Sequence, residues 1–467
     1  MHEIKFGTDG WRGIMSDDFT FENVIRVTQA IADYYKKTKG CTGLKFVVGY
    51  DTRFLSDKYA NLVSRVLAAN NISVVLSDKA VPTPVVSFSA KQRNFTAGIM
   101  ITASHNPGEY NGIKIKTSLG QAAGTEITKG VEENIKDYDP NIIAKADDGL
   151  IKKENLTDAY VAFLRSYINL KKFRNATYRV LVDVMYGSGN KFIAEVLKGT
   201  KIKLEFMRSN INPSFDGLRP EPVVENLKDT IKRMKREKFD LCLVLDGDAD
   251  RIAAIGPGGI YIPPQKILGL LFLHLLEDRA FSGGLVKTIC GTTMLEHIAQ
   301  KKNVKLFETP VGFKYISDLM VRQDILVGGE EAGGIGFKNY IPERDGTLAG
   351  LLLLEMMLYR KKPILSILEK IEKEYGRYFY LRQDLKVKSK VELDINRLKS
   401  LRNILGTEVV KVKDYDGIKF ILADESWLML RVSGTEPLVR IYAETKSIAR
   451  SKRYLDFGKE LLRRYAL

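Results

Sequence analysis

Cysteine and histidine are both scarce in this chain of 467 residues. Its three cysteines, Cys41, Cys242 and Cys290, lie far apart and never in a CxxC spacing, which argues against a disulfide framework and against a zinc site. We therefore expect a protein of the reducing cytoplasm. Only four histidines are present, and three of them lie at a terminus or in predicted helices, so a Ser-His-Asp triad is not expected.

Long apolar runs are also absent. The two most apolar stretches, ILGLLFLHLL (267–276) and LAGLLLLEMML (348–358), are too short to cross a bilayer and are interrupted by His274 and Glu355. The first residues, MHEIKFGTDGW, lack the apolar core of a secretion signal. These features predict two buried helices and no membrane partner.

Positive charge is in excess, with a formal net charge of +16. The basic residues are spread through predicted helices such as KRMKREK (232–238) and tails such as RSKRYL (450–455), with no aromatic RNA-binding motif beside them. We therefore favour a solvated basic surface over a nucleic-acid interface. An anionic small substrate would be steered toward such a surface.

One α/β unit recurs three times along the chain. Each unit has an apolar strand, a helix, a second strand and a third strand, the third strands being AGIMIT (97–102), FDLCLVLD (239–246) and DILVGGE (324–330). Near-continuous Val, Ile and Leu runs that alternate with helices are typical of parallel strands covered on both faces. From about residue 375 the pattern changes to short strands around a predicted helix at 391–405, which indicates an antiparallel α+β domain.

The sequence thus predicts an α/β fold of three similar mixed-sheet domains followed by a C-terminal α+β domain. We place these domains at residues 1–152, 153–257, 258–374 and 375–467. Because open α/β sheets bind ligands at the carboxyl ends of strands, the loops after the three third strands are candidate functional segments. These loops read TASHNP, DGDADR and GEEAGG.

The loop DGDADR places Asp246, Asp248 and Asp250 at alternate positions after a buried strand. Three carboxylates this close repel one another where water is scarce, and a divalent cation would relieve the repulsion. All-oxygen ligation favours Mg²⁺ or Mn²⁺ over zinc. We predict a metal site here rather than a solvated acidic turn.

Two glycine-containing segments offer anion sites. GTDGWRG (7–13) lets the backbone approach an anion closely and adds the charge of Arg12. RVSGTEPLVR (431–440) combines a guanidinium, two hydroxyls and the backbone N–H groups around a glycine. Each pattern, taken alone, is also compatible with an ordinary turn.

Ser104 lies beside His105 in TASHNPGEYNGIKIK (102–116). The G-x-S-x-G flanks of a hydrolase nucleophile are missing, and an adjacent histidine rarely reaches its neighbour's oxygen as a base. The alternation at the end of this stretch puts Lys114 and Lys116 on one face of a strand. The residue pattern does not choose between these two lysines.

The motifs FGTDGWRG, TASHNPGEYNGIK, DGDADR, GEEAGG and SGTEPLVR occur in this order nearly from end to end, and in this the chain resembles the α-D-phosphohexomutase superfamily. The resemblance is closest to the bacterial phosphoglucomutase/phosphomannomutase branch. It implies four domains around a central cleft, with Ser104 held as a phosphoserine. Ser104 would give its phosphoryl group to one end of a hexose monophosphate, forming a hexose 1,6-bisphosphate, and take the other phosphate back.

The resemblance also implies roles in phosphoryl transfer. Arg12 and Arg251 would hold the transferring group, with His105 beside it, and Lys114 would transfer the proton. We expect nearby cations to lower the pKa of Lys114, because only a neutral lysine can act as a base. One Mg²⁺ would be bound by an oxygen of Ser104 and by three carboxylates, those of Asp246, Asp248 and Asp250.

Further residues are implied to bind the substrate. Glu330 would bind sugar hydroxyls, and Lys287 and Lys314 would belong to the basic lining of the cleft. The non-reacting phosphate would be held by four residues of the last domain, namely Arg431, Ser433, Gly434 and Thr435.

The sugar loop departs from the family pattern at two positions. Ala332 replaces the usual serine, and Gly334 takes the place of a histidine found in one branch, whose role is lost or supplied elsewhere, for example by Arg344. We interpret the chain as a cytoplasmic, Mg²⁺-dependent mutase of glucose phosphates, with mannose phosphates as a further substrate, active as a monomer or homodimer.

Two alternatives remain. A phosphoglucosamine mutase is disfavoured because that branch carries Gln and His where this chain has Glu331 and Gly334. A catalytically silent sugar-phosphate sensor is disfavoured because Ser104, Lys114 and the three aspartates are all present.

Overall fold

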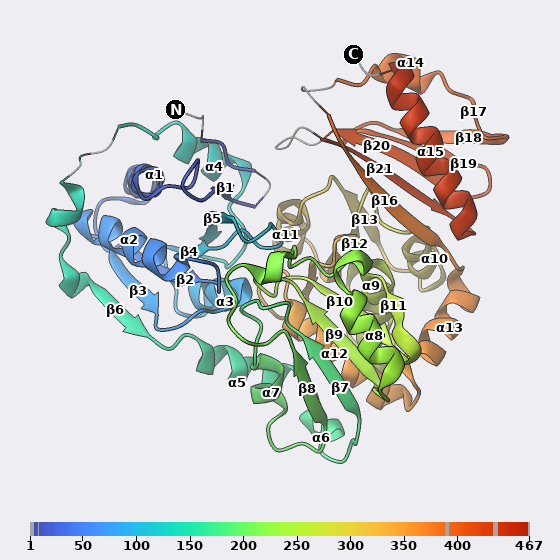
Figure 1. Cartoon of the computed structure of the whole chain (residues 1–467), viewed down its shortest axis with the longest axis horizontal. Coiled ribbons are helices and arrows are strands. Elements are labelled where there is room, and N and C mark those ends of the chain that lie inside the picture. The colour runs from blue at the N-terminus through green and yellow to red at the C-terminus, as the bar shows by residue number, and fades with distance from the viewer. Residues whose placement is uncertain are drawn as a thin grey trace.

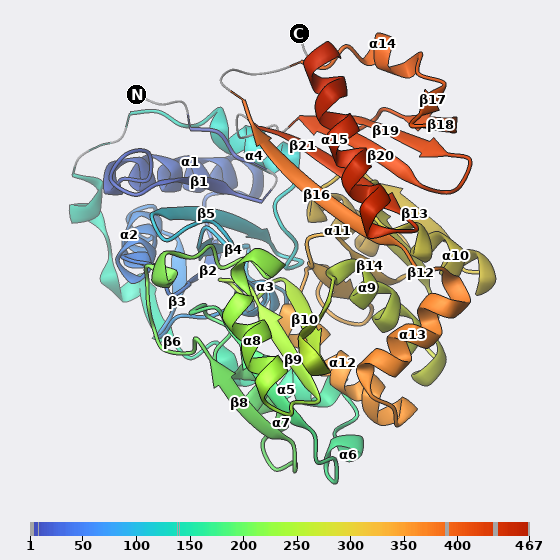
Figure 2. The same cartoon turned by 45° about the vertical axis from the view of Figure 1, so that its right-hand side comes forward.

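The computed structural model describes residues 4–7, 9–137, 139, 141–387, 392–432 and 438–465. Four domains follow one another along the chain, and each is built on its own sheet (Figure 1). The first three are α/β domains, and the fourth combines an antiparallel sheet with helices, as predicted. Both views place the fourth domain beside the third (Figures 1 and 2).

The first three sheets share one arrangement of four strands. A central strand pairs in parallel with a strand on either side, and one of these neighbours then pairs antiparallel with the strand that follows it in the chain. In sheet order the repeated sets are β5-β4-β2-β3, β10-β9-β7-β8 and β15-β14-β12-β13. The predicted threefold repeat is therefore a repeat of topology.

The first sheet has the order β1-β5-β4-β2-β3-β6. Its strands are β1 (Trp11–Ile14), β2 (Lys45–Tyr50), β3 (Ser73–Ser77), β4 (Ala97–Ile101), β5 (Tyr110–Thr117) and β6 (Ile151–Glu154). The second sheet consists of β7 (Arg179–Asp183), β8 (Lys203–Met207), β9 (Leu241–Leu245), β10 (Ile252–Gly256) and β11 (Ile260–Ile262). The third consists of β12 (Gly284–Thr288), β13 (Leu306–Thr309), β14 (Ile325–Gly329) and β15 (Ile335–Phe337).

The helices of the first domain are α1 (Phe21–Lys39), α2 (Ser56–Ala69), α3 (Thr83–Gln92) and α4 (Thr125–Glu132). Those of the second are α5 (Thr157–Tyr167), α6 (Leu170–Phe173), α7 (Phe192–Leu197) and α8 (Lys228–Arg236). Those of the third are α9 (Pro264–Leu273), α10 (Thr293–Lys301), α11 (Phe313–Arg322), α12 (Gly346–Arg360) and α13 (Ile364–Tyr375).

Strand β2 shows why the predicted strands are continuous apolar runs. Phe46 and Val48 face the core that includes α1 and α2, whereas Val47 between them faces a second core that includes α3. A strand buried on both faces has no position for a polar side chain. The alternation of polar and apolar residues is therefore lost.

The fourth sheet has the order β16-β21-β20-β19-β18-β17 and pairs antiparallel throughout. Its strands are β16 (Phe379–Lys386), β17 (Asn403–Ile404), β18 (Thr407–Lys413), β19 (Ile418–Leu422), β20 (Trp427–Val432) and β21 (Leu438–Thr445), and its long helix is α15 (Ile448–Tyr465).

The helix predicted at 391–405 is much shorter in the structure. Among the described residues of that segment, helix α14 covers only Ile395–Lys399 and is followed by β17. Leu405 and Gly406 both have positive φ, 48° and 87°, and form the turn between β17 and β18. A left-handed turn cannot continue a right-handed helix, so the prediction was wrong at this end.

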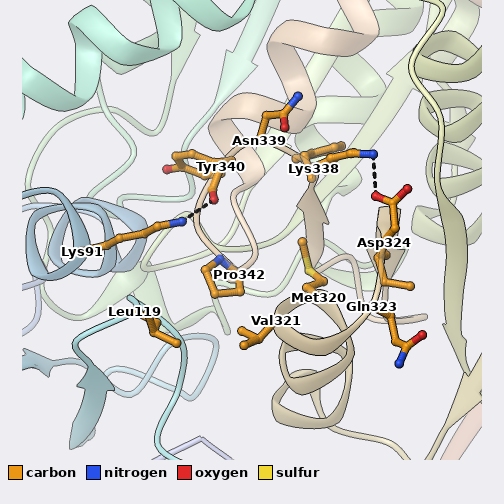
Figure 3. Close-up of a pocket in the computed structure, with 12 residues that line it drawn as sticks. Lys91, Leu119, Met320, Val321, Gln323, Asp324, Lys338, Asn339, Tyr340 and Pro342 are labelled. Atoms are coloured by element: carbon orange, nitrogen blue, oxygen red, sulfur yellow. Dashed lines mark hydrogen bonds and ion pairs between the residues drawn. The ribbon is translucent and has the colours of Figure 1, made fainter.

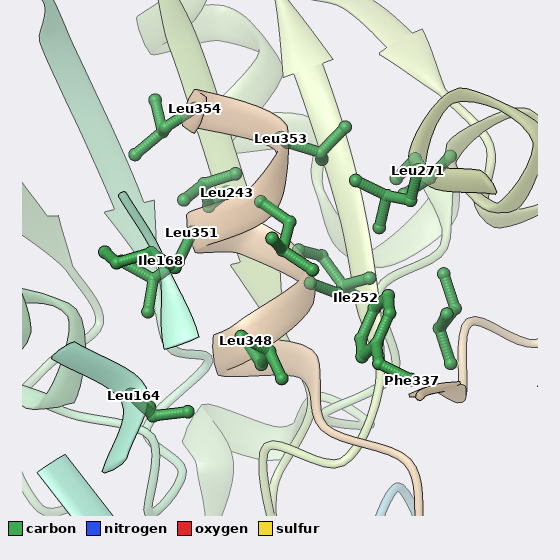
Figure 4. Close-up of a cluster of buried hydrophobic side chains, with 14 of the residues drawn as sticks. Leu164, Ile168, Leu243, Ile252, Leu271, Phe337, Leu348, Leu351, Leu353 and Leu354 are labelled. Carbon is green, nitrogen blue, oxygen red and sulfur yellow. The ribbon is translucent and has the colours of Figure 1, made fainter. Parts of the chain in front are cut away.

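Helix α12 accounts for the apolar stretch at 348–358. It follows the third sheet in the chain, yet it packs against β9 and β10 of the second sheet as well as against α9. Figure 4 shows its leucines pointing in several directions toward side chains such as Leu243, Ile252 and Leu271. The helix is apolar all round because it is buried all round. No helix among the described residues is long and apolar enough to cross a membrane.

Two of the proposed domain boundaries fall close to strands. Strand β6, which pairs with β3 of the first sheet, includes residue 152, and β11, which pairs with β10 of the second sheet, begins at residue 260. We propose that both domains extend to the ends of these strands.

Candidate active site

Loops from the three repeated sheets meet at one place. The loops after β4, β9 and β14 begin at equivalent strand ends, as the repeat predicts. Ser104 Oγ donates a hydrogen bond to Asp246 Oδ2 at 3.2 Å. A Cβ added to Gly247 would lie 2.4 Å from the carbonyl oxygen of Ser104, so only glycine permits this approach of the first two loops.

Ser104 adopts an unusual backbone conformation. Its φ is +53°, in the left-handed region that is costly for residues other than glycine, and its side chain is buried. Its backbone N–H donates to Thr102 Oγ1 at 2.8 Å. A conformation of this kind persists only when surrounding contacts hold it, and such residues cluster at active sites.

The three aspartates of DGDADR form a compact oxygen cluster. One carboxylate oxygen from each lies within 4.8 Å of the others, and all three side chains are buried. Asp248 Oδ1 and Asp250 Oδ1 accept no hydrogen bond from any residue that the structure describes. Burial, together with the charges of Asp250 and Asp248, raises the pKa of Asp246 well above its ordinary value. Unsatisfied oxygens in such a cluster fit a hard divalent cation such as Mg²⁺.

Removing a divalent cation bound at this cluster is therefore expected to inactivate the protein. EDTA should abolish turnover and added Mg²⁺ should restore it, since without the cation the carboxylate cluster would repel an anionic substrate. Asp248→Asn should weaken Mg²⁺ binding, as measured by the Mg²⁺ concentration needed for half-maximal turnover, while a circular dichroism spectrum shows a retained fold. Full turnover after exhaustive chelation would contradict the metal assignment.

The two lysines of β5 have different partners. Lys114 Nζ lies 2.8 Å from Asp248 Oδ2 and 3.1 Å from Asp250 Oδ2, in the acidic cluster. Lys116 Nζ instead lies 2.6 Å from Glu343 Oε2. Both side chains are buried. The structure thus brings Lys114, and not Lys116, to the predicted metal ligands.

The groups of the protein around Lys114 shift its pKa upward. Burial lowers the pKa of Lys114, but the surrounding carboxylates of Asp248, Asp250 and Asp9 outweigh burial and raise that pKa above its ordinary value. The expectation that Arg12, Arg251 and a bound Mg²⁺ together would lower this pKa stays a prediction, because the upward shift comes from the groups of the protein alone. Three acidic neighbours contact Nζ directly, whereas Arg344 is the strongest opposing charge.

The cationic residues predicted around Ser104 lie close to its loop. Arg12 Nη1 donates to Asn106 Oδ1 at 2.8 Å, and Arg251 Nε lies 3.9 Å from Asp246 and 3.8 Å from Asp250. Burial and the positive charges of Arg251, Arg12 and Arg382 lower the pKa of His105 well below its ordinary value, so the imidazole is neutral. This side of the cluster suits an anion.

Glu330 of the third loop is held by Arg344. Arg344 Nη1 lies 2.9 Å from Glu330 Oε2, and its Nε lies 2.8 Å from Asp250 Oδ2. A Cβ added to Gly334 would lie 2.5 Å from Cδ of Arg344. A histidine at position 334 and Arg344 in this position therefore exclude each other. Arg344 also forms an ion pair with Asp9, so it links the first and third domains at the site.

Three other predicted residues have partners outside the acidic cluster. Lys287 is buried against Glu296 and Glu308, at 2.5 and 3.4 Å. Lys314 Nζ donates to Thr125 Oγ1 at 3.0 Å, and Arg431 Nε lies 2.7 Å from Asp416 Oδ1. The predicted residues Ser433, Gly434 and Thr435 lie outside the described residues.

Several residues at the site were not predicted. Asp9 contacts Lys114 at 2.8 Å and Lys116 at 3.4 Å. Thr83 Oγ1 donates to Asp248 Oδ2 at 2.5 Å. Arg53 and Asp51 lie under the Ser104 loop, directly after β2. The position of YDTR at the carboxyl end of a parallel strand was a usable signal for the last two.

Two cavities lie elsewhere in the molecule. The one in Figure 3, of about 370 Å³, lies between α3, α11 and the segment after β15, where Lys91 Nζ donates to the carbonyl of Tyr340 at 2.9 Å. The other, of about 630 Å³, lies between the first and second domains and is lined by residues such as Lys79 and Asn190. Neither includes Ser104 or the acidic cluster.

Family profiles match the chain in four segments. "Phosphoglucomutase/phosphomannomutase, alpha/beta/alpha domain I" matches residues 3–141, domain II matches 158–259, domain III matches 263–375 and the C-terminal domain matches 385–458. The matches follow the order of the four domains in the structure.

Whole-length relatives are similar to the chain as well. A protein named phosphoglucomutase/phosphomannomutase from Thermococcus kodakarensis is 29% identical over 98% of both chains. A protein named "Probable phosphoglucosamine mutase" from Methanosphaera stadtmanae is 31% identical over 95% of this chain and 94% of its own. A solved structure from Thermus thermophilus, provisionally named a phosphomannomutase, has a TM-score of 0.87 and 30% identity over 99% of both chains.

Proposed function

Because this chain belongs to the phosphoglucomutase/phosphomannomutase family and is thereby a phosphohexomutase, we propose that it moves a phosphoryl group reversibly between the 1- and 6-positions of glucose, and of mannose as a further sugar. The observation that carries this proposal is the convergence of Ser104 on the oxygen cluster of the second domain, 3.2 Å from Asp246. We also propose that it acts in the cytoplasm, as a monomer or homodimer.

In this proposal Ser104 is a phosphoryl shuttle. The P–O bond of phosphoserine breaks as a sugar hydroxyl oxygen bonds to phosphorus, and a hexose 1,6-bisphosphate leaves Ser104 free. The bisphosphate then reverses its orientation, and its other phosphate is transferred to Ser104 Oγ. Phosphoryl transfer requires mainly that the protein positions the reacting groups and places positive charge around the equatorial oxygens of the phosphoryl group. Arg12 and Arg251 supply that charge.

Lys114 is the proposed proton-transfer group. To accept the proton of the sugar hydroxyl it must first lose its own, and its carboxylate neighbours oppose that loss. A divalent cation held by Asp248 and Asp250 would supply positive charge that offsets two of those neighbours and stabilises the transferring phosphoryl group. Asp9 would remain to hold Nζ in place, 2.8 Å away.

Glucosamine phosphates are the second candidate substrate, because one relative at 31% identity is named as a phosphoglucosamine mutase. Side-by-side assays with the 1-phosphates of glucose, mannose and glucosamine decide between them. We expect kcat/KM to be highest for glucose 1-phosphate. A higher kcat/KM for glucosamine 1-phosphate would overturn the proposed sugar, and no conversion of any of the three would overturn the proposed function.

The sugar loop should affect glucose and mannose equally. In the family that this chain resembles, the loop binds the 3- and 4-hydroxyls, which the two sugars present identically. Glu330→Gln should therefore lower kcat/KM for both by about 1.5–3 kcal/mol of transition-state binding, the range for a charged hydrogen bond. Ala332→Ser should change both by only about 0.5–1.5 kcal/mol.

Glu331→Gln is the matched control for Glu330→Gln, because Glu331 accepts instead from Thr288 Oγ1 at 2.7 Å. It should affect turnover less. A tenfold change in the ratio of kcat/KM for glucose 1-phosphate to kcat/KM for mannose 1-phosphate after Ala332→Ser, about 1.4 kcal/mol of discrimination, would mean that this loop recognises the sugar at carbon 2.

A further inference from the structure

Arg53 is a buried arginine whose five N–H groups all donate hydrogen bonds. A guanidinium has five N–H donors. Nε donates to Asp51 Oδ2 at 3.1 Å. The other four donate to backbone carbonyl oxygens of the Ser104 loop, which follows β4, and of Tyr110, the first residue of β5, at which the loop ends. These are the carbonyls of Ser104 at 2.6 Å, Asn106 at 2.7 Å, Pro107 at 2.7 Å and Tyr110 at 3.0 Å. The side chain has no exposed surface.

Asp51 holds this arginine and the loop together. Its Oδ1 accepts from the backbone N–H of Arg53 at 3.0 Å, and its Oδ2 accepts from Thr102 Oγ1 at 2.6 Å. Thr102 Oγ1 in turn accepts the backbone N–H of Ser104. Both the N–H and the C=O of Ser104 are therefore tied to the Asp51–Arg53 pair, one through Thr102 and one directly.

These two attachments hold the backbone of Ser104, the residue with the unusual conformation. Ser104 has φ of +53°, and the two peptide groups on either side of it define that angle. Fixing its N–H and its C=O supplies the surrounding contacts that a left-handed serine needs. The same contacts orient Oγ toward Asp246.

The direction of the carbonyl groups also matters for charge. A phosphoserine carries about −1.5 to −2 charges at neutral pH, so carbonyl oxygens facing it would be repulsive. Four carbonyls of this loop instead face Arg53. The far side of the guanidinium lies over the ring of Phe215 in the second domain, 4.8 Å from its centroid. The positive charge is thereby enclosed beneath the loop.

We infer that Arg53 is a positioning residue for phosphoryl transfer, which holds the Ser104 loop in the conformation that accepts and returns the phosphoryl group. This inference rests on the proposed function. Arg53 is not assigned a contact with the substrate, because its donors are already used. Replacing Arg53 should therefore slow the phosphoryl-transfer step. It should not weaken binding of the sugar, because that binding depends on Glu330.

The test compares Arg53→Lys and Arg53→Ala with Arg208→Ala. Arg208 is a matched control because it is also a largely buried arginine, paired with Asp183 and the carbonyl of Asn226, away from the Ser104 loop. For each variant we would measure the melting temperature, kcat and KM for glucose 1-phosphate, and the fraction of Ser104 phosphorylated by glucose 1,6-bisphosphate, using intact mass.

We expect Arg53→Lys to lower kcat by about 10²-fold, the cost of misplacing reacting groups by about 1 Å, and to leave KM near the wild-type value. Phosphorylation of Ser104 should be slowed to a similar degree. Arg208→Ala should lower the melting temperature without changing the phosphorylation rate. Millimolar guanidinium should restore part of the turnover of Arg53→Ala and none in Arg208→Ala.

Wild-type kcat and phosphorylation rate in Arg53→Lys would overturn the inference. So would an Arg53→Lys protein that fails to fold while Arg208→Ala folds, because the arginine would then support the whole domain rather than the loop. An inactive wild-type protein would instead refute the proposed function, so the two failures are distinguishable.

Discussion

Ser104→Ala is expected to abolish mutase turnover. Alanine removes Oγ, and with it the atom that we propose carries the phosphoryl group between the two ends of the sugar. No other route is available at a useful rate, because uncatalysed phosphate-monoester chemistry is slower than enzymatic turnover by up to about 10²¹-fold. Coupled assays with glucose 1-phosphate should give no rate above background.

The same variant has a second readout. Intact-mass analysis of the wild-type protein after incubation with glucose 1,6-bisphosphate should show a species heavier by one phosphate, and Ser104→Ala should show none. Ser64→Ala is a suitable control, because Ser64 is a buried serine that donates only within helix α2, to the carbonyl of Ala60 at 2.8 Å. Normal turnover in Ser104→Ala would refute the shuttle.

Lys114→Met should have the second-largest effect, a fall in kcat of about 10²–10⁴-fold, which is the usual contribution of a positioned acid or base. Methionine retains much of the apolar side chain but cannot hold a proton. KM for glucose 1-phosphate should change less than kcat, since the loss concerns the transfer step.

Lys116→Met is the matched control, because Lys116 lies two residues further on the same strand and is equally buried. Lys116 pairs with Glu343 at 2.6 Å and with Asp9 at 3.4 Å. Its removal leaves Glu343 with only the longer ion pair to Arg344, at 3.8 Å, and should destabilise the fold by up to about 3–5 kcal/mol. Its turnover per folded molecule should stay closer to that of the wild type. Equal losses of kcat in the two variants would remove the reason to assign proton transfer to Lys114.

The sequence predicts those parts of the fold and of the site that show as patterns of neighbouring residues along the chain. Strand β4 with its loop, and β9 with DGDADR, were recognisable because an apolar run followed by a polar loop is a pattern of adjacent residues. The helix expected at 391–405 was too long for the same reason, because its apolar spacing continued beyond Lys399, where α14 ends, through β17 to the turn at Leu405 and Gly406.

The contacts of Asp9, Arg53 and Arg344 could not be predicted in this way. Arg344 meets Asp9 across 335 positions in the chain, and Arg53 meets Asn106 across 53. The Arg344–Asp9 pair follows from how the domains pack, and the Arg53–Asn106 contact follows from the pairing of β2 with β4, rather than from spacing along the chain. The number of carboxylates around Lys114 Nζ, which raises its pKa, likewise could not be predicted from spacing along the chain.

The position of helix α12 limits which domains could be exchanged between related proteins during evolution. One apolar core extends from α3 and the first sheet through the second and third sheets, with α12 inside it. The fourth domain has a main core of its own, and a small buried cluster joins it to the third domain, consisting of Ile289, Cys290, Trp427, Met429 and Tyr442. Cutting the chain between the second and third sheets would expose the leucines of α12 to water. We therefore expect recombination between relatives to transfer the second and third domains as one piece, while exchange of the fourth domain has to preserve only the small cluster that it shares with the third.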